Sequence, residues 1–116
     1  MQAGIVCVGS SLGASFLAKY LSEETIGIHI SQLHLAAGRF FTRDESFRID
    51  AALLPNVAKQ CDKIFIYHSK DDFVVPFEDA SKFKQALPMA SLVVFEDRGH
   101  FLQEEFPELI ENIKRG

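Results

Sequence analysis

A short apolar segment that leads through a serine-containing turn into a helical pattern constrains the fold most strongly. Residues 4–8 (Gly-Ile-Val-Cys-Val) are continuously apolar, which is typical of a strand buried on both faces of a sheet. Residues 9–13 (Gly-Ser-Ser-Leu-Gly) follow directly, and apolar side chains then recur with helical spacing over residues 12–22. A strand, a tight turn and a helix in immediate succession predict the start of an α/β unit.

The alternation of strand and helix patterns continues to the end of the chain. Further strands are predicted at residues 28–37, 63–68 and 91–96. Helices are predicted at residues 49–60 with an interruption near Pro55, at residues 77–87, and from Pro107 onward, and a loop is predicted at residues 38–47. This order predicts an α/β fold with a four-stranded parallel sheet and flanking helices, in a single domain of residues 1–116.

Composition and charge narrow the classes of partner. The chain has 116 residues, of which 47% are hydrophobic, and this fits a domain with a buried core. A net charge of -4 without a basic run does not support binding to nucleic acid or to an anionic membrane, and no segment reaches the length of a membrane span. Cys7 and Cys61 are predicted to be free thiols in a reducing compartment. Because residues 1–8 do not resemble a signal peptide, we expect a cytoplasmic protein.

A candidate nucleophile lies in the predicted turn. Ser11 has glycine both two residues before and two residues after it, Gly9 and Gly13, whereas Ser10 does not. Such glycines permit the sharp turn that lifts a reactive serine above a sheet, and they let the strand and helix pack closely. The following helix start adds positive potential, and the Leu12 backbone N–H is a candidate donor to an oxyanion. The alternative is an ordinary glycine–serine turn without a reactive role.

Two further candidates follow the third and fourth predicted strands. Asp71 and Asp72 come just after the third strand, and His100 comes just after the fourth. The carboxyl ends of parallel strands share one edge of the sheet, so these side chains can approach Ser11. A carboxylate can orient a histidine, and the histidine can then act as a base for the serine. We assign Asp72 as the acid and expect Asp71 to cap the following turn; purely structural roles are the alternatives.

Other polar and aromatic residues are interpreted as structural. We expect structural roles for the histidines within or at the ends of strands, His29, His34 and His68. A solvated surface loop accounts for Arg39, Arg43, Asp44 and Glu45, with a substrate-facing loop as the alternative. Core positions are favoured over an acyl pocket for Phe40, Phe41 and Phe47.

The chain resembles the α/β-hydrolase superfamily in the order serine, aspartate, histidine and in three segments, residues 8–14, 72–79 and 99–101. The resemblance is strongest to the small serine hydrolases of the retinoblastoma-binding protein 9 type. It covers nearly the whole chain but only the C-terminal half to two thirds of a family member. It implies Ser11 as nucleophile, Asp72 as acid and His100 as base. It further implies esterase-like hydrolysis of small ester or acyl substrates without a metal or cofactor.

The chain departs from the superfamily pattern in two ways. Ser10 occupies a position where histidine is frequent, which is not a catalytic position. The early strands are missing, and with them the loop that supplies a second oxyanion donor, so this truncated α/β-hydrolase fold is expected to retain weakened catalysis. In the full fold the strand at residues 4–8 has neighbours on both sides. We therefore expect that strand to pair with a second copy of the chain or with a separate N-terminal partner.

Two other functions are compatible with these patterns. One is a catalytically silent α/β-hydrolase remnant that serves as a binding or interaction module. The other is a flavodoxin-like domain that binds phosphate at residues 9–13, although this turn lacks the lysine of a P-loop and the full glycine spacing of a dinucleotide fingerprint. Reactivity of Ser11 separates the hydrolase from the silent remnant.

Overall fold

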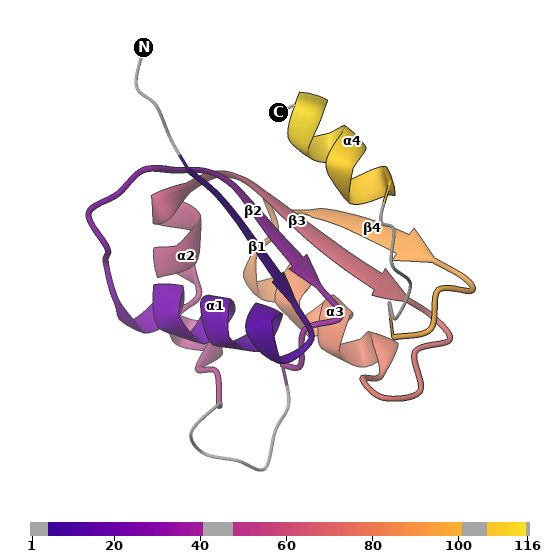
Figure 1. The fold of residues 1–116 in the computed structure, drawn as a ribbon. Coiled ribbons are helices and arrows are strands. Elements are labelled where there is room, and N and C mark those ends of the chain that lie inside the picture. The colour runs from indigo at the N-terminus through magenta and orange to yellow at the C-terminus, as the bar shows by residue number, and fades with distance from the viewer. Residues whose placement is uncertain (1–4, 41–47, 101–106, 116) are drawn as a thin grey trace.

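The computed structural model describes residues 5–40, 48–100 and 107–115 and contains the predicted alternation of strands and helices (Figure 1). The elements in chain order are β1 (Ile5–Ser10), α1 (Leu12–Glu23), β2 (Ile30–Ala36), a 3-10 helix η2 (Ala51–Leu53), α2 (Pro55–Gln60), β3 (Cys61–Ser69), α3 (Phe77–Ala86), β4 (Ser91–Phe95) and α4 (Pro107–Arg115). Each strand and helix predicted from the sequence is confirmed in kind, with shifted ends. Pro55 is the largest difference, because it begins α2 at a position that suits proline rather than interrupting one long helix.

The four strands form one parallel sheet in the order β1-β2-β3-β4. Helices α1, α2 and α3 cover one face of this sheet, and α4 lies on the opposite face (Figure 1). The predicted four-stranded parallel α/β sheet with flanking helices is therefore confirmed. All four strands run in the same direction, so their carboxyl ends meet at one edge of the sheet.

The main hydrophobic core lies between the sheet and helices α1, α2 and α3. Its sheet side is formed by alternating residues of the central strands, Leu33 and Leu35 from β2 and Ile64 and Ile66 from β3, all almost completely buried. Phe40 packs edge-on against Phe83 of α3 with ring centroids 5.2 Å apart, which confirms its interpretation as a core residue. Phe41 and Phe47 lie outside the described residues.

The face covered by α4 contains a chain of polar contacts in place of a large apolar cluster. Asn112 of α4 donates to the Tyr67 hydroxyl at 3.2 Å, and that hydroxyl lies 2.8 Å from His34 Nδ1. His34 Nε2 lies 2.8 Å from Gln32 Oε1, and the Gln32 amide donates to the Ile113 carbonyl at 3.1 Å. Burial lowers the pKa of His34 to about 4, so this imidazole is neutral at physiological pH. We call these five residues the α4 polar network.

Strand β1 lies at an edge of the sheet and is much more exposed than its sequence suggests. Val6 and Val8, which pair in register with Gln32 and His34, are 42% and 49% exposed. The prediction that this strand is buried on both faces is therefore wrong. Within the described residues, β1 has a strand neighbour on one side only, and α4 does not extend over it (Figure 1).

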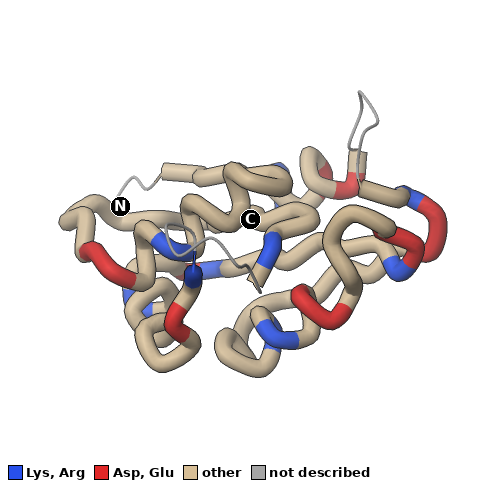
Figure 2. Tube along the Cα trace, turned by 90° about the horizontal axis from the view of Figure 1, so that it is seen from below, with Lys and Arg blue, Asp and Glu red and all other residues tan. Residues whose placement is uncertain are grey.

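The surface shows mixed charge, and no described helix has the length and apolar character needed to cross a bilayer. Lysine and arginine are interspersed with aspartate and glutamate over the described part of the chain, without a continuous basic stretch (Figure 2). Cys7 and Cys61 are both free thiols, as predicted. Burial, with the neighbouring Cys7 and Asp62, raises the pKa of the Cys61 thiol to about 12.

Candidate active site

Ser11 lies in the single-residue turn between β1 and α1, in a backbone conformation that non-glycine residues seldom adopt. Its φ is 55° and its ψ is -116°, and its backbone N–H donates to the Ala36 carbonyl at 2.8 Å. A Cβ at Gly9 would lie 2.8 Å from backbone atoms of Gly13 and Ala14, so that position requires glycine. A Cβ at Gly13 would meet no described atom within 4 Å, so the prediction that both glycines allow close packing holds only for Gly9.

The structure brings Ser11, His100 and Asp72 together at the carboxyl edge of the sheet. Ser11 Oγ lies 2.7 Å from His100 Nε2, and His100 Nδ1 lies 2.9 Å from Asp72 Oδ2. The imidazole therefore bridges a hydroxyl and a carboxylate that are 61 residues apart in the chain. A histidine that carries its proton on Nδ1 donates to the carboxylate and presents Nε2 as an acceptor to the serine.

Asp72 is fully buried at its side chain and uses both carboxylate oxygens. Oδ1 accepts the backbone N–H groups of Val74 and Val75 at 2.9 and 2.8 Å, while Oδ2 faces His100. The turn cap predicted for Asp71 is thus made by Asp72, and that assignment was wrong because a single carboxylate serves both purposes. Burial raises the pKa of Asp72, but the hydrogen bonds from His100, Val75 and Val74 outweigh it and hold the pKa below its usual value.

Asp71 instead joins the end of β3 to the loop that carries His100. Its Oδ1 accepts the Gly99 N–H at 2.8 Å and the Ser69 hydroxyl at 2.5 Å. These two hydrogen bonds lower the pKa of Asp71. Neighbouring aspartates therefore contact the histidine loop in different ways, Asp72 through the imidazole and Asp71 through the backbone.

His68 is a further buried residue at the site, and the sequence analysis assigned it only a structural role. Its Nε2 lies 2.8 Å from the Val75 carbonyl and 3.5 Å from Asp72 Oδ2. The spacing of four residues between His68 and Asp72 is not helical here, since a strand end and a turn separate them. Only the fold of that turn brings the two side chains together, so no sequence pattern would have indicated the contact.

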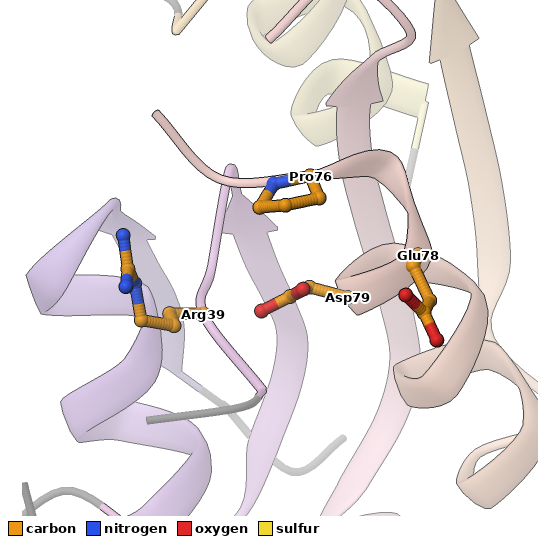
Figure 3. A pocket seen from close by; sticks show the side chains of 4 residues that line it. All are labelled: Arg39, Pro76, Glu78 and Asp79. Atoms are coloured by element: carbon orange, nitrogen blue, oxygen red, sulfur yellow. The ribbon is translucent and has the colours of Figure 1, made fainter. Parts of the chain in front are cut away.

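An open hollow of about 430 Å³ lies beside the start of α3, lined by Arg39, Pro76, Glu78 and Asp79 (Figure 3). The Arg39 guanidinium is exposed and donates to the Val74 carbonyl at 3.0 Å. Buried Asp79 accepts the Phe40 N–H at 2.8 Å. The other charged residues of the predicted loop, Arg43, Asp44 and Glu45, lie outside the described residues. Across the described segments, no group of three or more His, Cys, Asp or Glu side chains is arranged to hold a metal ion.

Comparison with known proteins identifies the fold. No family model matches the sequence, and no curated protein matches it. Among solved structures, the ydeN gene product from B. subtilis is similar at a TM-score of 0.77 and 19% identity, over 95% of this chain and 63% of that protein. Alpha/beta hydrolase domain-containing protein 10 from mouse is similar at a TM-score of 0.67 and 14% identity, over 99% and 62%. The chain has an α/β-hydrolase fold.

A third structure agrees with this fold and with the extent of the match. The lipase-esterase related protein from Clostridium acetobutylicum is similar at a TM-score of 0.63 and 16% identity, over 98% of this chain and 66% of that protein. The chain thus spans less than two thirds of the length of each of these three proteins. The α/β-hydrolase fold excludes the flavodoxin-like fold that was the alternative from the sequence.

Proposed function

We propose that this chain is a serine hydrolase with esterase-like activity on small ester or acyl substrates. The observation that carries the proposal is the continuous contact from Ser11 Oγ to His100 Nε2 and from His100 Nδ1 to Asp72 Oδ2, at 2.7 and 2.9 Å. A serine becomes nucleophilic when a positioned base takes its proton, and a buried carboxylate stabilises the resulting imidazolium. Other hydrolases and esterases share the fold, which is compatible with this chemistry.

In the proposed reaction, Ser11 Oγ attacks the acyl carbonyl while His100 Nε2 takes its proton. The bond to the leaving alcohol then breaks, and His100 returns the proton to that alcohol. Water attacks the acyl-serine by the same route, releasing the acid and restoring Ser11. Asp72 remains ionised through the cycle, because its lowered pKa lies below physiological pH.

One donor to the oxyanion is proposed from the described residues. Leu12 is the first residue of α1, and its backbone N–H is the proposed donor to the oxyanion. Loss of one of two donors lowers rates by about 10²- to 10³-fold, whereas loss of the nucleophile costs about 10⁶-fold. With the Leu12 N–H as sole donor, slow hydrolysis of activated esters is expected.

We further propose that residues 1–116 form a single domain equivalent to the C-terminal portion of an α/β-hydrolase of the retinoblastoma-binding protein 9 type. The motifs at residues 8–14, 72–79 and 99–101 support this assignment. We also propose that the enzyme is cytoplasmic. We propose that it uses no metal or organic cofactor, since a serine–histidine–aspartate site needs none.

A fluorophosphonate probe followed by intact-mass measurement tests the hydrolase proposal. We expect one covalent adduct on the wild-type chain, no adduct on Ser11→Ala, and an unchanged adduct on the matched control Ser10→Ala. Circular dichroism of each sample establishes that it is folded. Absence of an adduct on folded wild-type protein, or an adduct that persists in Ser11→Ala, would overturn the proposal.

The second candidate function is that of a catalytically silent remnant acting as an interaction module, and exposed apolar side chains favour it. Leu12, Phe16 and Tyr20 recur every four residues along one stripe of α1, and each is more than two fifths exposed. This stripe follows directly on the open edge strand β1. For either function, we propose that residues 4–8 pair with a second copy of this chain or with a separate N-terminal partner, because unpaired apolar edges recruit strands.

Light scattering at tens of micromolar protein tests this pairing. We expect wild-type protein to associate and Val8→Lys to associate less, because the charge lies beside the open edge of β1. Val94→Lys is the matched control, since Val94 is similarly exposed on the strand at the far side of the sheet. A stable monodisperse monomer of the wild-type chain would contradict the proposal.

A further inference from the structure

We propose that Asp71 is a positioning residue, which holds the backbone of the histidine loop so that His100 stays aligned between Asp72 and Ser11. This inference rests on the proposed hydrolase function for its catalytic consequence. Its structural basis is a pair of hydrogen bonds. The backbone N–H groups of the two residues before His100 both donate to side chains at or just after the carboxyl end of β3. The Gly99 N–H donates to Asp71 Oδ1 at 2.8 Å, and the Arg98 N–H donates to Ser69 Oγ at 3.0 Å.

Ser69 and Asp71 act as one unit. The Ser69 hydroxyl donates to Asp71 Oδ1 at 2.5 Å, and Ser69 is completely buried while Asp71 is exposed. Ser69 Oγ also lies 3.3 Å from the Phe95 carbonyl at the end of β4. We call the pair Ser69 and Asp71 the loop clamp. It fixes the loop to β3 at the point where β3 and β4 cease to pair.

The loop needs such a restraint because its backbone conformation is unusual. Gly99 has a φ of 57°, and glycine moves between positive and negative φ with little energetic penalty. A flexible residue directly before His100 would let the imidazole leave both of its partners. Hydrogen bonds to the N–H groups of residues 98 and 99 fix the peptide planes on either side of Arg98, so the loop backbone is held as far as the nitrogen of Gly99 and only the torsions of Gly99 itself lie between this held segment and His100.

The clamp is coupled to the acid by chain connectivity. Asp71 and Asp72 are consecutive, so one dipeptide holds the histidine loop by its backbone and the histidine by its ring. The imidazole nitrogens must stay within hydrogen-bonding distance of both partners for proton transfer, and displacements of about 1 Å lower rates by about 10²-fold. Asp71 thus affects the reaction through the position of His100 and does not act on Ser11 directly.

Rates of fluorophosphonate labelling and of 4-nitrophenyl acetate hydrolysis test the proposal on the full chain. We expect Asp71→Ala to react about ten- to hundredfold more slowly. The loss should appear in kcat with KM unchanged. Asp71→Asn keeps an Oδ1 acceptor and should recover most of the rate. Asp62→Ala is the matched control, because it removes the same charge from the opposite end of β3 and should leave the rate unchanged.

Ser69→Ala provides a second variant, which leaves Asp71 in place but removes the hydroxyl that donates to it. Because both residues belong to one clamp, Asp71→Ala and Ser69→Ala combined should cost less than the product of their separate losses. Equal rates for Asp71→Ala and wild type would overturn the positioning role. A loss in Asp71→Asn as large as in Asp71→Ala, with a shifted pH profile, would also overturn it, because the negative charge would then be the active feature.

A measurement that does not need activity separates this inference from the proposed function. In nuclear magnetic resonance spectra, the Gly99 amide should be protected from hydrogen exchange and the His100 Nδ1 proton should be observed in the wild type. Both signals should weaken in Asp71→Ala and persist in Asp71→Asn. Unchanged signals in Asp71→Ala would overturn the clamp. If wild type shows these signals and their loss in Asp71→Ala but does not react with the probe, the hydrolase proposal fails while the clamp stands.

Discussion

The two faces of the sheet are held to their helices by different kinds of interaction. On the face of α1, α2 and α3, buried leucine, isoleucine and alanine side chains form one continuous core. On the face of α4, the buried apolar cluster comprises Ala36, Ala37 and Tyr67, and the α4 polar network spans strand and helix. Apolar packing tolerates many arrangements of similar volume, whereas a chain of hydrogen bonds fits only one placement of the helix.

This difference bears on the site, because the histidine loop lies between β4 and α4. Arg98 of that loop forms a bidentate ion pair with Glu108 in the first turn of α4. Its guanidinium lies 4.6 Å from the centroid of the Phe95 ring. We expect the apolar face to supply most of the free energy of folding, and the polar face to fix the positions of α4 and of Arg98. Three predictions test this division.

The largest effect is expected on the apolar face. Leu33 is completely buried in the main core, so Leu33→Ala should lower the free energy of unfolding by about 3 to 4 kcal/mol, through lost burial and the cavity left behind. Urea denaturation followed by circular dichroism measures this value. A loss below about 1 kcal/mol would show that the apolar face contributes less than the comparison requires.

A pH-dependent loss of stability is expected on the polar face. His34 has a pKa of about 4 when folded and about 6.5 when unfolded, so the unfolded chain binds more protons between these values. Stability should therefore fall by up to about 3 kcal/mol as the pH drops from 6.5 to 4, and it should not change further from this group below pH 4. Denaturation curves across this range measure the slope. His34→Gln removes the titrating group, and an equal slope in that variant would assign the effect elsewhere.

The smallest effect is expected from one hydroxyl of the α4 polar network. Tyr67→Phe should lower stability by about 1 to 2 kcal/mol, because Asn112 and His34 both lose a hydrogen-bond partner. Tyr20→Phe is the matched control, since Tyr20 is exposed on α1 and should lose almost nothing. If the two variants are equally stable in urea, the α4 polar network does not hold α4 in place.

The sequence predicted the elements of the sheet because they are governed by local patterns. Apolar runs, helical spacing and proline positions indicated every strand and helix, and the order of motifs indicated which three side chains meet. The exposure of Val6 and Val8 was not predicted, because an apolar run looks the same in a central strand and in an edge strand. The catalytic roles of Ser11, Asp72 and His100 remain predictions, as does the partner of β1.

Contacts that depend on turn geometry were also beyond the sequence. Which of Asp71 and Asp72 caps the turn depends on the direction of each side chain, and two adjacent aspartates carry no pattern that separates them. The approach of His68 to Asp72 and the link between Asn112 and Tyr67 likewise join residues whose spacing has no regular period in the sequence. Such contacts follow from the completed fold.

The backbone of Ser11 has a consequence for how this chain would respond to selection. Its φ of 55° favours glycine, and a non-glycine residue in such a region carries strain of about 1 to 3 kcal/mol. A library of variants sorted only for heat resistance should therefore enrich Ser11→Gly, whereas a library sorted for ester cleavage should retain serine. The residue found at position 11 thus shows whether a population of these chains was selected for heat resistance or for ester cleavage.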